Sequence, residues 1–223
     1  MKACGRYYPE RVDDVAWEND LTAFRAYGPA LQETGERAFG YDIWTKYNTT
    51  EPVVEARYEG ELNPDMKAKI AELGKTDPKA AQELYRSVSY HVDHGNGLDC
   101  YKVGPTLGGG TTALMAGDTI VYPYCYATQE ILDNGPLRFT VKLVYNPLVV
   151  KGDSTIIETR IITLDAGSYC NKTVVSYTNL KETMPLAVGI VLHEPDGAIV
   201  ADAANGYMTY VDPTDNAGGD NGK

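Results

Sequence analysis

The chain has 223 residues, of which 31 are acidic and 20 are basic, so its formal net charge at pH 7 is −11. A surface this acidic repels nucleic acid phosphates and anionic membranes, and no basic stripe offsets the repulsion, so we expect neither partner. Hydrophobic residues make up 43% of the chain, which is enough for a globular core. The sequence has no run of 18 apolar residues, so we predict no transmembrane segment.

Residues 1–62 mix strand patterns with turns. The stretch "LTAFRAYGPAL" alternates as a strand does until the break at Gly28-Pro29, and this alternation places Arg25 and Tyr27 on one face. The stretch "ERAFGYDIWTKYN" is typical of a pair of strands around Gly40.

Residues 63–90 are the strongly helical region of the sequence. Asn63-Pro64 and Asp77-Pro78 each combine an N-cap residue with a proline at the first helical position. We therefore predict two helices, the first ending at Gly74 and the second leading directly to His91.

From Asp118 onward, short segments rich in Val, Ile, Thr and Tyr alternate with turn signals such as Asn205-Gly206. Successive strands without intervening helices indicate antiparallel sheets. We predict a mainly β fold, an antiparallel β-sandwich in a single domain over residues 1–223, with a helical insertion at about 63–90. Both ends of the sequence look cut, so we expect a fragment of a longer chain.

The segment "YHVDHGNGLDCYKVGPTLGGG", residues 90–110, crowds chemically active side chains into one predicted loop: His91, Asp93, His94, Asn96, Asp99 and Tyr101. One histidine could be a general acid or base that a neighbouring aspartate orients. A metal site is the weaker interpretation, because the spacing is not HExxH and a third clear ligand is missing, so we predict no metal. The glycine run lacks the spacing of a phosphate loop, and we predict no cofactor. A plain connecting loop is the remaining alternative.

A second cluster lies in "AWENDLTAFRAYGP", with Trp17, Glu18, Asn19, Asp20, Arg25 and Tyr27. An arginine beside aromatic rings can bind a sugar carboxylate by a bidentate contact and by stacking. The alternative is structural, with Trp17 in the core and Glu18 or Asp20 paired with Arg25. From spacing alone the structural alternative is the stronger one.

Two further features leave their alternatives open. The stretch "VLHEPDG" places His193 at the end of an apolar strand, where it could reach a cleft or cap a turn. The four cysteines, at positions 4, 100, 125 and 170, contain no CxxC pair and permit three disulfide pairings or buried free thiols.

Three stretches, "PERVDDVAWENDLTAFRAYGPAL", "DHGNGLDCYKVGPTLGGG" and "LKETMPLAVGIVLHE", together resemble the bacterial domain-of-unknown-function family 4861. The resemblance covers nearly the whole chain. It implies a relative of the galactose mutarotase-type β-supersandwich, an exported protein of the periplasm or cell surface, and a role on acidic polysaccharides. The matching positions are Trp17, Glu18, Asn19, Asp20, Arg25 and Tyr27 in the first stretch, and His94, Gly95, Asn96, Gly97, Asp99 and Tyr101 in the second.

We therefore expect a carbohydrate-active enzyme, a lyase, hydrolase or epimerase, that acts on a saccharide containing uronic acid. Arg25 would neutralise the uronate, and His94 would be the general acid or base, oriented by Asp99 or Asp93. Tyr101 would be a second proton carrier, His91 a further catalytic candidate, and Glu18 or Asp20 a rival base. Substrate-binding candidates are Trp17, Glu18, Asp20, Arg25, Tyr27 and Asn96. A non-catalytic carbohydrate-binding module and a structural surface protein are the alternatives.

Overall fold

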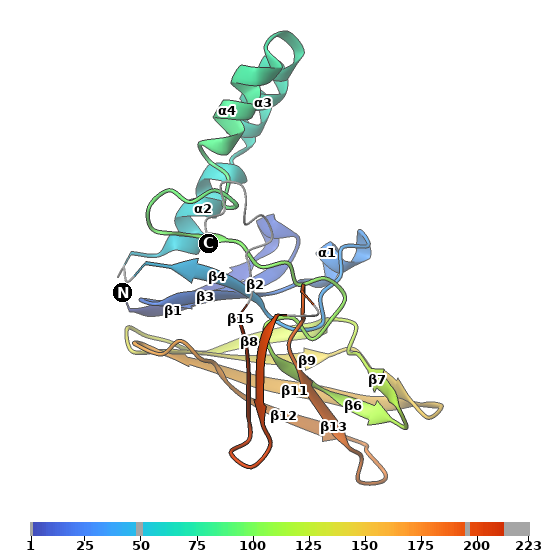
Figure 1. Ribbon diagram of the computed structural model, residues 1–223. Coiled ribbons are helices and arrows are strands. Elements are labelled where there is room, and N and C mark those ends of the chain that lie inside the picture. The colour runs from blue at the N-terminus through green and yellow to red at the C-terminus, as the bar shows by residue number, and fades with distance from the viewer. Residues whose placement is uncertain (1, 48–50, 195–196, 212–223) are drawn as a thin grey trace.

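The computed structural model describes residues 2–47, 51–194 and 197–211 (Figure 1). Within these residues the chain is mainly β, with antiparallel sheets and a helical segment in the first half. The predicted fold class is confirmed at this level.

The first sheet is formed by the N-terminal half of the chain. Its order is β1 (Ala3–Tyr8), β2 (Asp14–Asn19), β3 (Thr22–Ala26), β4 (Asp42–Lys46) and β5 (Gly97–Asp99), with every neighbouring pair antiparallel. The register pairs Arg25 with Asp42 and Trp44 with Asp99. Because side chains alternate along a strand, these residues collect on one face of the sheet.

The second sheet comes from the later β region. It contains β8 (Tyr126–Asn134), β9 (Arg138–Tyr145), β10 (Leu148–Val150), β11 (Asp153–Asp165) and β12 (Lys172–Thr178). The long strand β11 pairs with β9, β10 and β12. One face of this sheet packs against the first sheet, and their shared core contains Val15, Trp17, Phe24, Phe139, Val141, Leu143, Ile162 and Leu164.

Two smaller sheets complete the β structure. One contains β6 (Thr111–Ala116), β7 (Thr119–Val121) and β13 (Leu186–Gly189), and the other is the hairpin of β14 (Ala198–Asp202) and β15 (Tyr207–Val211). The turn predicted at Asn205-Gly206 joins the strands of this hairpin, and Gly206 adopts the positive φ of 69° that such a turn requires.

The helices are α1 (Pro29–Glu33), α2 (Val53–Glu61), α3 (Pro64–Thr76) and α4 (Pro78–Arg86), with one 3-10 turn at Pro9–Arg11. Both predicted N-caps are confirmed, because the side chains of Asn63 and Asp77 accept hydrogen bonds from the first-turn backbone of α3 and α4. Figure 1 shows α3 and α4 projecting away from the sheets.

The helical segment differs from the prediction in its start and in the end of its first predicted helix. It begins at Val53 rather than at residue 63, since Val53, Val54 and Tyr58 are buried and tertiary packing outweighs the strand propensity of valine. Helix α3 also continues through Gly74 to Thr76. A lone glycine weakens a helix by about 1 kcal/mol without ending it, whereas the residue before Pro78 is turned out of helical geometry.

The strand pair predicted around Gly40 is wrong. A single strand, β4, lies in this stretch, and the residues before Gly40 are irregular. A Cβ atom at Gly40 would lie 1.8 Å from the carbonyl oxygen of Leu107, so glycine is needed here for close backbone approach rather than for a hairpin turn.

The outer face of the first sheet packs against α2. A second hydrophobic cluster joins Tyr8, Trp44, Val54, Tyr58 and Tyr90. Among the described residues, no helix is long and apolar enough to span a membrane. The four cysteines are free thiols, of which Cys100 and Cys125 are buried.

Candidate functional site

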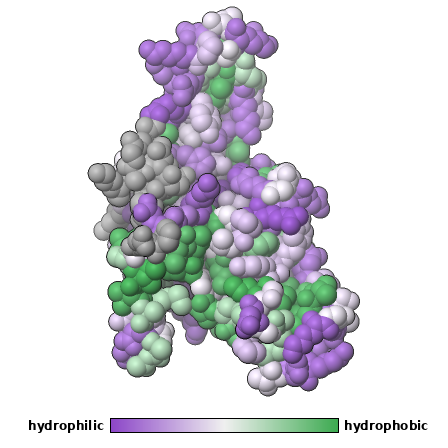
Figure 2. All heavy atoms as spheres, turned by 45° about the vertical axis from the view of Figure 1, so that its right-hand side comes forward, coloured by the Kyte–Doolittle hydropathy of each residue, from purple (hydrophilic) through white to green (hydrophobic). Residues whose placement is uncertain are grey.

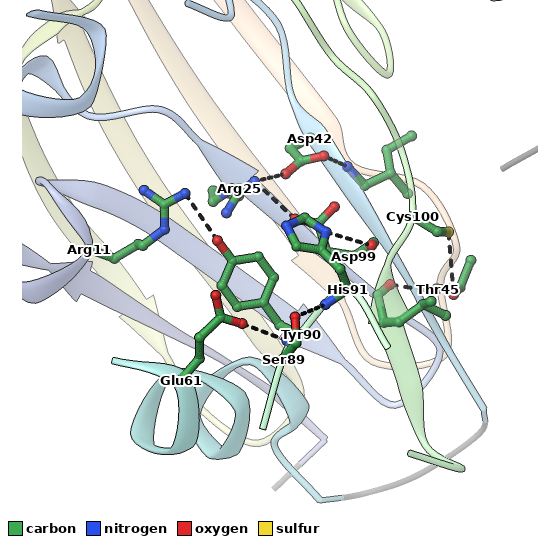
Figure 3. A network of polar contacts seen from close by, with 12 residues as sticks. Arg11, Arg25, Asp42, Thr45, Glu61, Ser89, Tyr90, His91, Asp99 and Cys100 are labelled. Atoms are coloured by element: carbon green, nitrogen blue, oxygen red, sulfur yellow. Dashed lines mark hydrogen bonds and ion pairs between the residues drawn. The ribbon is translucent and has the colours of Figure 1, made fainter. Parts of the chain in front are cut away.

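The outer face of the first sheet contains a buried arginine surrounded by carboxylates. Arg25 of β3 forms an ion pair with Asp42 of β4, and its Nη2 lies 3.1 Å from Asp99 Oδ2 in β5. Its Nε lies 3.8 Å from Asp14 Oδ2 in β2. Figure 3 shows Arg25 directed toward Asp42 and Asp99. Four neighbouring strands therefore contribute to one charged cluster.

Burial of this cluster shifts the acidity of its carboxyl groups. Removal from water raises the pKa of Asp14 to about 6, and the nearby Arg25 opposes the shift. Burial, together with the Asp99 carboxylate, raises the pKa of Asp42 to about 7. Arg11 gives Asp14 a second cation at 3.8 Å. With three carboxyl groups and two guanidinium groups, the cluster can retain a proton near neutral pH.

Tyrosine hydroxyls surround Arg25. Its Nη2 donates to the Tyr27 hydroxyl at 3.3 Å, and its Nη1 donates to the Tyr58 hydroxyl at 3.4 Å. Burial raises the pKa of both phenols, so both remain protonated at neutral pH. Arg11 donates to the Tyr90 hydroxyl at 3.2 Å, as Figure 3 shows.

A pocket of about 410 Å³ lies beside this cluster. Five predicted residues line it: Arg25, Tyr27, His91, Asp99 and Tyr101. The lining also includes Arg11, Glu36, Arg37, Tyr90 and Lys102. Arg11 and Arg25 are paired with buried carboxylates of the cluster. The exposed cations Arg37 and Lys102 make the rest of the pocket suited to an anionic ligand.

His91 is the histidine that reaches this pocket. Its Nδ1 lies 3.2 Å from the Asp99 carbonyl oxygen and 3.9 Å from Asp99 Oδ2, and 46% of its side chain is exposed. In the neutral ring the contact with the carbonyl assigns the proton to Nδ1 and leaves Nε2 as the basic atom. Helix α4 ends at Arg86, so His91 lies in a turn after the helix rather than on it.

Other residues of the predicted loop have different surroundings. His94 does not line the pocket, and its Nε2 lies 3.0 Å from the Ser89 carbonyl oxygen. Asn96 accepts a hydrogen bond from Arg57. Asp93 accepts a hydrogen bond from the Tyr47 hydroxyl at 2.7 Å. The loop is therefore divided, and only part of it faces the pocket.

Tyr101 lines the pocket, but its hydroxyl group is directed to the backbone. The hydroxyl donates to the Gly108 carbonyl oxygen at 3.3 Å, and the ring contacts His193 edge to face at 5.3 Å. His193 also approaches the Lys102 carbonyl oxygen at 2.5 Å. His193 thus supports the segment that carries Tyr101 and Lys102.

The first predicted cluster divides in the same way. Trp17 lies in the core between the sheets, where its Nε1 donates to Asn171 at 2.8 Å, and Asn19 donates to the Asp165 carbonyl oxygen at 2.7 Å. Asp20 accepts a hydrogen bond from the Gly167 backbone at 2.7 Å. These positions agree with the structural alternative for this part of the cluster.

Glu18 has a different structural role from the one that the sequence suggested. Its Oε2 lies 2.6 Å from Lys46 Nζ, and its carboxylate accepts hydrogen bonds from the backbone N–H groups of Val53 and Val54. Neither Glu18 nor Asp20 pairs with Arg25, because Asp14, Asp42 and Asp99 occupy that position.

Sequence reasoning did not find Arg11, Arg37, Lys102, Asp14 or Asp42. Asp42 shares its strand face with Trp44 and Lys46, but nothing in the local pattern indicates that this face meets Arg25. Arg11 ends the 3-10 turn and Arg37 and Lys102 lie in two separate loops, so these cations meet through the fold. No local motif could have grouped them.

A larger cavity of about 530 Å³ lies on the other face of β3 and β4. Its lining includes Leu21, Phe24, Tyr41 and Ile43, and none of the predicted site residues. Its charged residue, Lys46, is already paired with Glu18. The smaller, cationic pocket is therefore the better candidate for a site.

Comparison with known proteins places the whole chain in one family. Residues 1–223 match the model of a domain of unknown function, DUF4861, and the chain belongs to this family. An "Uncharacterized protein P7" of Formosa agariphila is 29% identical over 212 residues, which cover 92% of this chain and 47% of that protein. The chain thus spans about half the length of this relative. No solved structure matches this chain.

Proposed function

We propose that the chain is a carbohydrate-active protein that binds the carboxylate of a uronic-acid-containing saccharide in the cationic pocket. The observation that carries the proposal is the presence of two exposed cations, Arg37 and Lys102, in one pocket of an acidic protein. Tyrosines accompany these cations, and a tyrosine offers a sugar both an apolar ring face and a polar hydroxyl. An exported location and a galactose mutarotase-type supersandwich belong to the same proposal.

Ligand charge would be neutralised mainly by residues other than Arg25. Arg25 is 3% exposed and already contacts three carboxylates, so its charge is compensated within the protein. Arg37 and Lys102 are exposed and form no ion pair within the described parts of the chain. Arg25 would instead hold Asp99 and Tyr27 in place, while Arg37 and Lys102 contact the ligand.

His91 is the proposed proton-transfer residue. Its Nε2 can take a proton from the carbon beside the uronate carboxylate, and the cations then stabilise the negative charge that develops on that carboxylate. Return of a proton to the opposite face of the carbon gives an epimer. Departure of the glycosidic oxygen from the next carbon, with a proton from Tyr27 or water, gives an unsaturated product.

A non-catalytic binding module is the second candidate. One observation favours it: the Tyr101 hydroxyl, the predicted second proton carrier, donates to a backbone carbonyl. Such a module requires affinity for the saccharide but no proton transfer.

The first experiment incubates the protein with a panel of acidic oligosaccharides and follows the products by mass spectrometry. Addition of water indicates hydrolysis, and an unsaturated uronide indicates elimination. Unchanged mass with measurable binding leaves an epimerase, which NMR of the sugar detects, or the binding module. Absence of both binding and turnover across the panel would overturn the proposal.

Two histidine variants then test the assignment. We expect His91→Ala to lower turnover by about 10²- to 10⁴-fold, the usual contribution of a general acid or base. His94→Ala is the matched control, because His94 lies in the same loop and does not line the pocket. If His94→Ala abolished turnover and His91→Ala did not, the assignment would be reversed.

A charge variant tests ligand binding independently of catalysis. We expect Lys102→Gln to weaken binding of an acidic saccharide by about two- to fivefold, as expected for one exposed ion pair, and to reduce the salt dependence of binding. Lys79→Gln, an exposed lysine of α4 outside the pocket, is the control. Equal behaviour of the two variants would contradict the role of Lys102.

A further inference from the structure

An aromatic surface adjoins the cationic pocket through Arg37. Arg37 lines the pocket, and its Cζ atom lies 5.3 Å from the centroid of the Tyr124 ring. Two residues further along the chain, Phe39 stacks on Tyr122 with ring centroids 4.9 Å apart and an interplanar angle of 28°. Tyr122 and Tyr124 are each 37% exposed. The segment that forms one wall of the pocket thus also contacts two partly exposed tyrosines.

These contacts fix the rings beside the pocket. A guanidinium group over a tyrosine ring is attracted by the negative face of the ring, and stacked rings restrict each other. Tyr124 is therefore held by a residue of the pocket wall, and Tyr122 is held by Phe39. Scattered exposed tyrosines are ordinary on protein surfaces. Tyr124 and Tyr122 differ because Arg37 and Phe39, which belong to the segment at the pocket wall, pack against them.

The size of the pocket also bears on the ligand. At about 410 Å³ it lies toward the lower end of the range for small-molecule sites. A longer saccharide whose charged unit occupies the pocket must continue past its rim. The wall that contains Arg37 offers such a path over rings that suit the apolar face of a sugar.

We propose that Tyr124, supported by Arg37 and by the Phe39–Tyr122 stack, forms a second subsite for the sugar unit next to the charged unit in the pocket. The ligand class is accordingly an acidic oligo- or polysaccharide rather than a free uronic acid. This inference rests on the proposed function, because it requires the pocket to hold the charged unit.

The test compares ligands of increasing length by calorimetric titration. The probes are galacturonic, glucuronic and mannuronic acids and their di- and trisaccharides. We expect the disaccharide of the preferred series to bind more tightly than the monosaccharide. Tyr124→Ala should lower the ratio of disaccharide affinity to monosaccharide affinity by about two- to tenfold, the range expected for one aromatic contact. Tyr124→Trp should keep the ratio or raise it.

Tyr207→Ala is the matched control, because Tyr207 is 50% exposed, belongs to β15 and does not line the pocket. Thermal unfolding checks that each variant is folded. If monosaccharide and disaccharide bound equally well and Tyr124→Ala did not alter the ratio, the second subsite would be wrong while the proposed function stood. If no uronic acid or oligomer bound at all, the proposed function itself would fail.

Discussion

At the scale of single residues, the feature that most distinguishes this protein is the excess of carboxyl groups around Arg25. Asp14 and Asp42 are fully buried and Asp99 is 2% exposed, and within the described residues the guanidinium groups of Arg25 and Arg11 lie beside them. Burying carboxylates close together is costly, and burial raises the pKa of both Asp14 and Asp42. The stability of the fold should therefore depend on pH.

Replacing Asp42 should reveal this dependence. Its folded-state pKa of about 7 lies above the unfolded value of about 3.9, so the folded state binds more protons between these values and the free energy of unfolding falls as pH rises through them. A single group can contribute a slope of up to about 1.4 kcal/mol per pH unit. We expect Asp42→Asn to make the decline between pH 5 and pH 7 shallower in urea unfolding.

The exposed residue Asp118 supplies a control for this measurement. Asp118→Asn should leave the slope as it is in the unmodified protein. Asp42→Asn also loses an ion pair with Arg25, so the informative quantity is the slope with pH and not the stability at one pH. An unchanged slope would show that Asp42 is ionised throughout this range.

At the scale of elements, the attachment of α2 to the first sheet depends on Glu18. The helix begins after Pro52, and no local side chain caps it. The Glu18 carboxylate on β2 instead accepts hydrogen bonds from Val53 and Val54, and a carboxylate is well placed at the positive end of a helix. Its ion pair with Lys46 compensates the charge. One residue therefore connects two strands and a helix.

We expect Glu18→Ala to destabilise the protein by about 3–5 kcal/mol, because the change leaves the buried Lys46 ammonium without its carboxylate partner. The measurement is the free energy of unfolding in urea. Glu72→Ala is the control, because it removes the glutamate of the exposed Lys75–Glu72 ion pair on α3. It should cost at most about 1 kcal/mol. A loss below about 1 kcal/mol for Glu18→Ala would contradict a stabilising role for this carboxylate.

At the scale of the whole molecule, burial is distributed unevenly. The core between the two large sheets contains fully buried rings and aliphatic side chains, whereas β14 and β15 pair with each other and with no other strand of the described chain. Ile199, Val200 and Val211 are 46%, 52% and 71% exposed. Figure 2 shows hydrophilic residues over most of the projecting helices α3 and α4 and hydrophobic residues gathered on the strand-rich part below them.

Amide hydrogen exchange should follow this distribution. A two-stranded hairpin is at best marginally stable by itself, so we expect the amides of Ile199 and Val200 to exchange with little protection. The amides of Val141 in β9 and Ile162 in β11, which lie in the core, should exchange near the global unfolding limit. Equal protection of the hairpin and the core strands would mean that the hairpin is stabilised by contacts beyond those described.

Part of this architecture could be predicted from local sequence alone. The segments rich in Val, Ile, Thr and Tyr after Asp118, the Asn205-Gly206 hairpin, and the caps at Asn63 and Asp77 depend on residues close in sequence. The structure has β-strands in this region, the hairpin and both caps. The start of α2 could not be predicted in this way, because its cap is Glu18, 35 residues before Val53.

The site shows the same division. The sequence by itself predicted Arg25, Tyr27, His91, Asp99 and Tyr101 as site candidates, because polar and aromatic residue types are concentrated in two short stretches. Tertiary structure decided which of them share a pocket, added Arg11, Arg37 and Lys102, and placed Trp17 and Glu18 in structural roles. Side-chain type and local periodicity are properties of the sequence, whereas the pairing of β3 with β4 and of β4 with β5, which brings Asp42 and Asp99 to Arg25, is a contact between distant segments.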